Sequence, residues 1–417
     1  MIDVAVLRHQ PGLLEASLRR RGLAVDVAEL GALDAKRREV RAGAEDLRAQ
    51  QKEVGKNIAN LEGEERQRAI ESAGELAEQY KASLAEADDL DAAFNAQWTV
   101  LPNLTDPTAA DGLTDEDSVE LSVVGDPPAG DWMKDHVDLG EQHGFLDIER
   151  AAKLSGSRFG ALLGPMVRLE LALVQYALDH LEPHGFVPVA PPVLVREQAL
   201  FGTGFFPSDR EQVYAIEADD LYLVGTSEVS IAGMFADEIF DADTLPQRYV
   251  GFSSCFRREA GTYGKDTRGI FRVHQFDKVE MFSFCEPERS REEHDFLLER
   301  EEELAQGLEI PYRVVNVAAG DLGASAAKKY DIEAWFPGQG RYREITSTSN
   351  TTDYQSRRLK IRYRSDEGNK FVHTLNGTAI AVGRWLIAIV ENHQQRDGSI
   401  TVPEALLPYV AFDRIGG

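Results

Sequence analysis

The residues between Cys255 and Glu280 are the densest group of chemically active side chains in the sequence. Two strand-like stretches flank a loop that contains Gly261, Gly264, Gly269 and several arginines. Arginine on a strand can hold a phosphate through two parallel hydrogen bonds, and a glycine loop can close over a substrate. The pattern indicates a site for a phosphorylated substrate, although composition alone would also allow an ordinary basic hairpin turn.

Signatures of other kinds of site are missing from the sequence. Neither glycine-rich nucleotide loop, GxxxxGK[ST] or GxGxxG, occurs, and Gly202-Thr203-Gly204 is only a fragment of one. His180 and His184 have the spacing of metal ligands on a helix, but Pro183 should break that helix and there is no HExxH motif. We therefore expect no metal–histidine site and no zinc.

Length and charge limit the class of protein. A chain of 417 residues exceeds what one hydrophobic core usually organises, so two domains are expected. A hydrophobic fraction of 43% and a charged fraction of 28% exclude collagen-like, disordered and disulfide-scaffold chains. The 45 Lys and Arg against 71 Asp and Glu leave a net charge of −26. Such a chain repels phosphate, which argues against a general nucleic-acid-binding protein unless positive charge is gathered locally, and we expect no DNA partner.

Several features predict a reduced, cytoplasmic protein with no membrane partner. Cys255 and Cys285 are too few for a disulfide framework, and we expect both to be structural. The N-terminus lacks the basic and apolar segments of a signal peptide. The most apolar stretch, Thr378 to Val390, is short and carries Arg384, so we do not expect it to span a bilayer.

Residues 28–99 have the pattern of two long helices. Leucine or valine recurs every seven residues from Leu33 to Leu61, as in the seam of a coiled coil, and further heptad positions follow from Ile70 to Trp98. The polar break around Gly63 predicts a short turn, and hence an antiparallel hairpin. A first helix of about 32 residues would give an arm roughly 48 Å long.

The two predicted helices differ in charge. Between Ala35 and Asn60 seven bases face four acids, whereas between Leu61 and Val100 three bases face ten acids. Interhelical ion pairs in a solvated coiled coil would explain this distribution, and so would a docking surface for a polyanion. The residues that would form the docking surface are Arg37, Arg38, Arg41, Arg48, Lys52 and Lys56.

The remainder of the chain has mixed secondary structure. A linker rich in Pro, Asp, Gly and Thr places a boundary near Asp106, which gives domains 1–105 and 106–417. Strands at irregular spacing, without repeated βαβ units, favour an antiparallel sheet flanked by helices and thus the α+β class. The expected helices are 159–181, 296–308 and 379–392, and the expected strands are 186–189, 221–224, 248–253, 278–284 and 361–363.

The chemically dense segment resembles motif 2 of the bacterial-type seryl-tRNA synthetases, which are class II aminoacyl-tRNA synthetases. The matching residues are Arg257-Arg258-Glu259-Ala260-Gly261, the loop to Arg268, His274-Gln275-Phe276 and Lys278-Val279-Glu280.

Further segments resemble the same family in the same order, and the resemblance covers nearly the whole chain. Motif 1 has its counterpart in Gly185-Phe186-Val187-Pro188-Val189 with Pro191-Pro192, and the family's serine-binding TxE has its counterpart in Thr226-Ser227-Glu228. Motif 3 has its counterpart in Leu375-Asn376-Gly377-Thr378 with Ala381-Val382-Gly383-Arg384 and Glu391-Asn392. The predicted hairpin is similar to the family's tRNA-binding coiled coil.

The resemblance implies a set of site residues. Arg257 and Arg384 would be catalytic, and Glu344 with Ser347 would hold Mg²⁺ together with ATP. The implied ATP-binding residues are Arg257, Arg258, Glu259, Val273, Phe276, Glu344, Ile345, Thr346, Ser347 and Arg384. The implied serine-binding residues are Thr226, Ser227, Glu228, Arg257, Glu280, Asn376 and Thr378.

The implied function is that of a homodimeric serine–tRNA ligase. It would activate L-serine with ATP and charge tRNA(Ser) and tRNA(Sec), with the basic arm residues contacting tRNA. Positive charge at the nucleotide site would come from Arg257, Arg258, Lys265, Arg268, Arg272 and Arg384. Two alternatives stay open: a paralogue, either an antibiotic-resistant duplicate or a ligase that loads a carrier protein, and a non-enzymatic coiled-coil adaptor.

Overall fold

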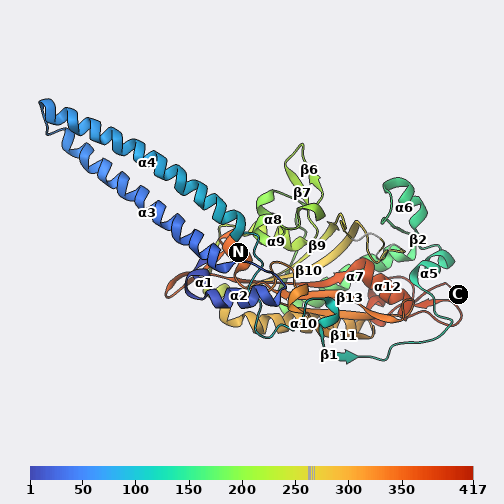
Figure 1. Cartoon of the computed structure of the whole chain (residues 1–417). Helices are drawn as coiled ribbons and strands as arrows, with labels where there is room; N and C mark the ends of the chain where they lie inside the picture. Colours follow the sequence, from blue (N-terminus) through green and yellow to red (C-terminus); the bar gives the residue numbers. More distant parts are fainter. Residues whose placement is uncertain (262–263, 265, 267, 417) are drawn as a thin grey trace. The chain divides into compact units, whose positions relative to one another are not determined.

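Contacts within the chain divide it into two compact units. The computed structural model describes residues 1–261, 264, 266 and 268–416 (Figure 1). One unit contains Asp3–Arg19 and Leu23–Leu101, and the other contains Met1–Ile2, Arg20–Gly22 and the chain from Pro102 onward. Lys265, one of the predicted basic residues, lies outside the described residues. Among the helices of the described chain, none combines the length and apolarity that crossing a membrane would require.

The N-terminal region is helical throughout. Its helices are α1 (Val4–His9), α2 (Pro11–Arg20), α3 (Val27–Ile58) and α4 (Gly63–Trp98). Helices α3 and α4 lie side by side along their length (Figure 1), which confirms the predicted hairpin. Asp26 caps α3 by accepting a hydrogen bond from the Glu29 amide. Most predicted heptad positions are buried or half-buried, but Ile70 near the tip is 44% exposed.

The larger unit is built on an eight-stranded sheet. All neighbouring strands are antiparallel except β4 and β9, which are parallel. In spatial order the strands are β1 (Val119–Val124), β11 (Tyr312–Asn316), β12 (Lys328–Phe336), β13 (Arg341–Asn350), β16 (His373–Ala381), β10 (Gln275–Cys285), β9 (Gln247–Phe256) and β4 (Phe186–Val189). The sheet confirms the predicted α+β class.

Shorter elements complete this unit. The helices are α5 (His136–His143), α6 (Ile148–Ser155), α7 (Pro165–Leu181), α8 (Glu197–Thr203), α9 (Ser227–Met234), α10 (Ser290–Gly307), α11 (Tyr354–Leu359) and α12 (Val382–Asn392). The small sheets contain β2 (Leu146–Asp147), β3 (Ala161–Leu162), β5 (Leu194–Val195), β6 (Ala215–Ile216), β7 (Leu221–Leu223), β8 (Ile239–Asp241), β14 (Arg362–Ser365), β15 (Gly368–Phe371), β17 (Ile400–Thr401) and β18 (Arg414–Ile415).

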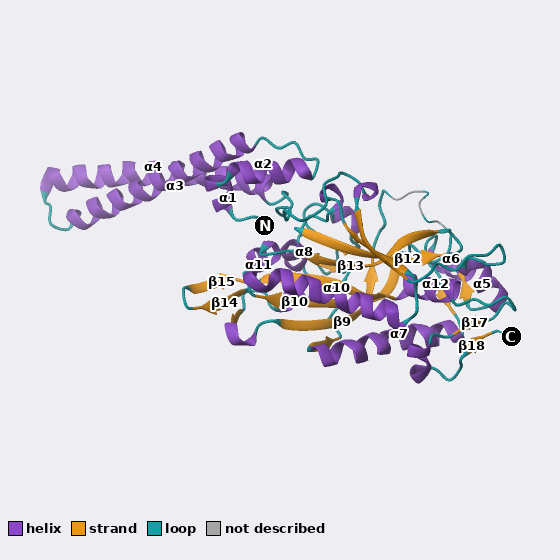
Figure 2. Ribbon diagram, turned by 90° about the horizontal axis from the view of Figure 1, so that it is seen from below, coloured by secondary structure: helices purple, strands orange, loops and turns teal. Residues whose placement is uncertain are grey.

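The two faces of the large sheet have different roles. Helices α7 and α10 run alongside strands β9 and β10 (Figure 2), and side chains from these elements share one apolar core. Side chains alternate along β10, so Ser283 points to α10, where its hydroxyl donates to Glu293 at 2.7 Å. Lys278 and Glu280 therefore point to the opposite face, which is free to form a site.

Two predicted helices begin later than expected. The helix predicted from Phe159 begins at Pro165, because Ala161–Leu162 forms β3 and Gly164 takes a φ of 54°. The helix predicted from Ala379 begins at Val382, because residues up to Ala381 complete β16. Apolar residues in a buried strand and in a buried helix look alike in sequence.

Glu301 of α10 is an unusual residue on the covered face of the sheet. Its carboxyl is fully buried, and neither oxygen has a hydrogen-bond partner among the described residues. It lies against Gly377 of β16, where a Cβ atom would be only 2.9 Å from Glu301 Oε1. Burial, and then the charges of Glu280 and Asp331, raise the pKa of Glu301 well above its usual range. The carboxyl is therefore kept protonated at a cost in stability.

Replacement of this carboxyl by an apolar side chain should stabilise the protein. Glu301→Met removes an unsatisfied polar group at similar volume, and we expect the free energy of unfolding to rise by about 1–3 kcal/mol. Because the raised pKa makes the wild type lose stability as pH rises above the unfolded value, the gain should be larger at pH 8 than at pH 5. Urea unfolding at both pH values measures it, with exposed Glu292→Met as control. A destabilised Glu301→Met protein would contradict the expectation.

Candidate active site

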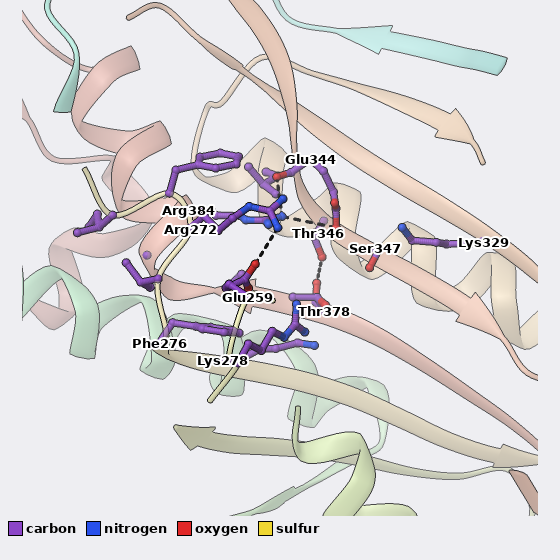
Figure 3. A pocket seen from close by; sticks show the side chains of 17 residues that line it. Glu259, Arg272, Phe276, Lys278, Lys329, Glu344, Thr346, Ser347, Thr378 and Arg384 are labelled. Carbon is purple, nitrogen blue, oxygen red and sulfur yellow. Dashed lines mark hydrogen bonds and ion pairs between the residues drawn. The ribbon is translucent and has the colours of Figure 1, made fainter. Parts of the chain in front are cut away.

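A pocket of about 340 Å³ lies on the uncovered face of the sheet, where β10, β13, β16 and the start of α12 meet (Figure 3). Arg257 and Glu259 reach it from the segment after β9. The pocket brings together most of the predicted ATP-binding residues, namely Arg257, Glu259, Val273, Phe276, Glu344, Ile345, Thr346, Ser347 and Arg384, with Thr378 of the predicted serine set.

A β-bulge in β13 aims two predicted ligands at the same pocket. Glu344 and Ser347 are three residues apart, so a regular strand would point them to opposite faces. The pairing with β12 shifts between Thr346 and Glu344, and the extra residue, Ile345, restores both to one face. Glu344 and Ser347 therefore supply a carboxylate and a hydroxyl to the pocket, which are oxygen donors of the type that Mg²⁺ prefers.

A second bulge, in β16, has the same effect. The pairing between β10 and β16 shifts between Ile380 and Thr378, and Thr378 and Ala381 then both line the pocket. Thr378 is thereby placed opposite Glu280, and its hydroxyl donates to Glu280 Oε2 at 3.4 Å.

The two predicted catalytic arginines enter the pocket from different elements. Arg257 donates from Nε to the Gly225 carbonyl at 3.2 Å, and its guanidinium lies 5.2 Å from the centre of the Phe276 ring. Arg384, in the first turn of α12, donates to the Glu344 carbonyl at 3.0 Å and stacks over Phe271 at 4.9 Å. Both cations are thus held by backbone and aromatic groups, and both line the pocket.

Glu259 belongs to a chain of ion pairs at the pocket rim. Its Oε2 lies 2.8 Å from Arg272 Nη1, and Arg272 in turn lies 3.7 Å from Asp266. Asp266 also pairs with Arg343 at 2.8 Å. Glu259 has a φ of 50°, a left-handed conformation that turns the chain at this point.

Arg258 differs from the other predicted ATP-binding residues because it does not line the pocket. Its amide donates to the Gln212 carbonyl at 2.9 Å, and its guanidinium lies 5.9 Å from the centre of the Tyr214 ring. The Arg258 guanidinium is therefore directed toward Tyr214, while that of the adjacent Arg257 lines the pocket.

Lys329 is a pocket residue that sequence reasoning missed. It lies on β12, a strand that was not predicted, and its ammonium is 2.9 Å from Asp331. Burial tends to raise the pKa of Glu344, but the charges of Lys329, Arg384 and Arg257 outweigh it and lower the pKa to about 2. Glu344 is therefore ionised at any physiological pH. Ile270, Phe271, Arg272, Lys278, Ala381 and Gly383 also line the pocket.

The predicted serine-binding residues form a second cluster that adjoins the pocket through Lys278. Lys278 lines the pocket, forms an ion pair with Glu280, and donates to the Thr226 hydroxyl at 3.2 Å. Thr226 caps α9 by accepting a hydrogen bond from the Glu228 amide. Asn376 Nδ2 donates to Glu228 Oε1 at 3.0 Å.

Glu228 is a buried acid with a raised pKa. Its side chain is almost fully enclosed, and burial together with the nearby charge of Glu280 raises its pKa to about 7. Ser227 beside it is fully buried, and its hydroxyl donates to the Gly251 carbonyl at 3.4 Å. Of the adjacent pair, Glu228 is thus the side chain that joins the polar cluster, whereas Ser227 bonds to the backbone of β9.

Two of the predicted arm residues, Arg37 and Arg41, form ion pairs between the helices, of the kind that the first interpretation of the arm describes. Arg37 pairs with Asp34 and with Asp91 of α4, and Arg41 pairs with Asp88 and Asp91. The others contact neighbours more loosely: Arg38 pairs with Asp34 and is 54% exposed, Arg48 donates to the Tyr80 hydroxyl, Lys56 is 76% exposed beside Glu53, and Lys52 is exposed.

His180 and His184 lie closer together than the break at Pro183 led us to expect. The chain continues directly from α7 into a 3₁₀ turn (Glu182–His184). The centres of the His180 and His184 rings are therefore 5.4 Å apart, and both rings lie near Glu303. Arg300 already provides a cation at this place, since its Nη1 lies 2.8 Å from His184 Nδ1 and its Nη2 lies 2.8 Å from Glu303. Both cysteines are fully buried, in keeping with structural roles.

Comparison with known proteins agrees with this arrangement. A model of the seryl-tRNA synthetase N-terminal domain matches residues 1–105, and a model of the tRNA synthetase class II core domain (G, H, P, S and T) matches residues 212–393. A serine–tRNA ligase of Thermobifida fusca is 52% identical over 99% of this chain and 98% of its own length.

Solved structures are similar over the full length. The crystal structure of seryl-tRNA synthetase from Pyrococcus horikoshii complexed with ATP has a TM-score of 0.93 and 42% identity, covering 100% of this chain and 99% of that one. A cytoplasmic serine–tRNA ligase of Naegleria fowleri in complex with AMP has a TM-score of 0.89 and 33% identity, covering 100% and 98%. With both of its family models matched and full-length relatives above half identity, the chain belongs to the seryl-tRNA synthetase family.

Proposed function

We propose that this chain is a serine–tRNA ligase that activates L-serine with ATP and transfers the seryl group to the 3′ end of tRNA(Ser). The observation that carries the proposal is the junction of two sites. A pocket with Arg257, Glu344 and Arg384 suits a nucleotide, and the adjoining Glu228–Glu280 cluster suits a small amino acid. A non-enzymatic adaptor would have no use for this junction.

The reaction has two balanced steps. An oxygen of the serine carboxylate attacks the α-phosphorus of ATP, the bond to the β-phosphate oxygen breaks, and pyrophosphate leaves. A ribose hydroxyl of the terminal adenosine then attacks the seryl carbonyl, AMP leaves, and the hydroxyl proton is released. Neither step needs a protein nucleophile, so catalysis rests on positioning and on charge stabilisation. The inert, buried cysteines agree with this mechanism.

The arginines provide the charge that the first step needs. Arg257 would contact the α-phosphate, where negative charge builds up in the transition state, and Arg384 would contact the γ-phosphate. Phe276 would stack on the adenine, and Glu259 would accept a hydrogen bond from the adenine amino group. Glu259 is bonded to Arg272 at 2.8 Å, so binding of adenine would share or replace that contact.

Glu344 and Ser347 would hold Mg²⁺ together with ATP. Both are hard oxygen donors on the same face of β13, and Glu344 is ionised, so the residues present fit this metal. The ion would neutralise phosphate charge and orient the triphosphate. Zinc takes no part in the proposed reaction.

The serine cluster would recognise both ends of its substrate. Glu228 would accept hydrogen bonds from the α-ammonium, while Glu280 and Thr378 would bond to the side-chain hydroxyl. A site of this kind leaves buried polar groups unpaired when alanine enters, and such sites reject the analogue by roughly 10⁴–10⁵. No editing domain is then required.

We infer that the partners are tRNA and a second copy of the chain. The exposed cations of α3, such as Arg38 and Lys56, would contact tRNA(Ser) and, as the family resemblance suggests, tRNA(Sec). Val187, in the segment that resembles motif 1 and on the edge strand β4, is 54% exposed, and so is Leu171 of α7, which supports a homodimer interface that includes this edge. The cytoplasm is the expected location. A carrier-loading ligase would have no need of the long arm.

Serine-dependent ATP–pyrophosphate exchange, followed by charging of purified tRNA, tests the function. Arg257→Ala should lower the exchange rate at least about 100-fold, because a positive charge at the transition state is lost. Exposed Arg289→Ala, in the short 3₁₀ turn directly before α10, does not line the pocket, serves as control and should retain the exchange rate. Absence of serine-dependent exchange in the wild type would disprove the proposal, and exchange without tRNA charging would favour the carrier-loading ligase.

Serine binding should weaken in acid. A Glu228 carboxyl with a pKa of about 7 binds an ammonium only when it is ionised, and this ionisation is lost as pH falls through that value. The KM for serine in the exchange assay should therefore rise about fivefold between pH 7 and pH 6, whereas the KM for ATP should change much less. Glu228→Gln should bind serine poorly at every pH. A serine KM that is constant from pH 6 to pH 8 would contradict this role.

Removal of the arm should separate the two steps. Residues 33–98, which include the stacked pair Arg37 and Phe94 at 3.9 Å, can be replaced by a short Gly-Ser linker. Exchange should persist, because the arm contributes no residue to the pocket, and tRNA charging should be lost. Equal loss of both activities in a folded protein would contradict this division.

A further inference from the structure

Gln355 is a fully buried amide that contacts the serine cluster from behind. It lies in the first turn of α11, and its side-chain Nε2 donates to Glu228 Oε1 at 2.6 Å. The same nitrogen donates to the Thr203 carbonyl at 3.1 Å, and the Thr374 hydroxyl donates to Gln355 Oε1 at 2.8 Å. All four residues involved are buried.

These neighbours determine which way the amide points. A backbone carbonyl can only accept, so the atom that faces Thr203 must be the nitrogen. The other side-chain atom of Gln355 is then the oxygen, which accepts a hydrogen bond from the Thr374 hydroxyl at 2.8 Å. The NH₂ group of Gln355 is thereby held toward Glu228 and cannot flip.

The two carboxylate oxygens of Glu228 differ in their hydrogen bonds. Oε1 accepts hydrogen bonds from two amide groups, those of Gln355 and Asn376, whereas Oε2 has no hydrogen-bond partner among the described residues. A planar carboxylate held through one oxygen by two donors has a defined orientation, and its other oxygen is available to a ligand.

Hydrogen bonds to Oε1 also act on the charge of Glu228. Burial and the neighbouring carboxylate of Glu280 favour the protonated form, whereas the Gln355 amide and the charges of Lys278 and Arg257 favour the ionised form. Glu280 and Lys278 face Glu228 from β10 and Arg257 from the end of β9, while α11 and β16 present the neutral Gln355 and Asn376. Gln355 is thus one of two neutral donors to Glu228, and it makes the shorter of the two hydrogen bonds.

We propose that Gln355 is a positioning residue for serine activation, which holds the Glu228 carboxylate ionised and with Oε2 presented to the substrate ammonium. The inference rests on the proposal that Glu228 receives this ammonium. The Thr374 hydroxyl and the Thr203 carbonyl contribute to this positioning, because their hydrogen bonds fix the orientation of the Gln355 amide. Gln355 itself does not touch the substrate.

Exchange kinetics with Gln355→Met test the proposal. This variant keeps the side-chain volume and removes the donor, so we expect the serine KM at pH 7.5 to rise about 10–100-fold, the range of a hydrogen bond to a charged group. The KM for ATP should differ from the wild-type value by less than about twofold, because the residues that line the nucleotide pocket are unchanged. The pH below which the serine KM climbs should move upward, because the lost donor had favoured ionisation.

The matched control is Gln394→Met. Gln394 is equally enclosed, and its amide donates to the Lys134 and Glu391 carbonyls, away from the serine cluster. It should lose comparable stability and keep the wild-type serine KM and pH profile. An unchanged serine KM and profile in Gln355→Met, or an equal fall in serine and ATP binding, would overturn the proposal.

A second variant decides the matter if Gln355→Met does not fold. Thr374→Val removes the hydroxyl that bonds to Gln355 Oε1, and it should raise the serine KM about 2–5-fold with the same upward displacement of the pH profile. A wild-type profile in Thr374→Val would then overturn the role of Gln355. Failure of the proposed function would differ, since the wild type itself would show no serine-dependent exchange.

Discussion

The crowding of carboxylates behind and within one pocket is the constraint on which the site depends. Glu228, Glu280 and Glu344 carry charge that is costly to bury, and each has its own compensation. Glu344 faces Lys329 and Arg384, Glu280 is paired with Lys278, and Glu228 has only amide donors nearby besides more distant cations. Glu228 is therefore the acid with the least compensation, which suits a group whose partner is a cationic substrate.

The antiparallel sheet makes this arrangement possible because it brings distant segments into register. Lys278 and Glu280 of β10 point to the pocket, and the bulges in β13 and β16 turn additional side chains to the same face. The other face is covered by α7 and α10 and is largely apolar. The buried Glu301 is the exception there, an ionisable side chain placed on the apolar face of the sheet.

The net charge of −26 does not conflict with a nucleotide and tRNA as substrates. The cations that line the pocket are Arg257, Arg272, Lys278, Lys329 and Arg384, so the local charge differs in sign from that of the whole chain. On α3 the cations are partly neutralised by α4, and those that stay exposed, such as Arg38, are the ones available to RNA. The acidic remainder limits non-specific binding of nucleic acid.

Local patterns in the sequence were sufficient for the helical hairpin and the α+β class, and the family resemblance named most of the residues that line the pocket. Heptads, turn residues and motif spacing report on neighbours within a few turns of chain. They could not show that Lys329 reaches the pocket, although apolar and polar residues alternate along its strand from Tyr330 to Ala334. Nor could they show the contact of Gln355 with Glu228, 127 residues earlier. The face to which Glu344, Ser347 or Arg258 points depends on bulges and strand register, which only the pairing of distant strands decides.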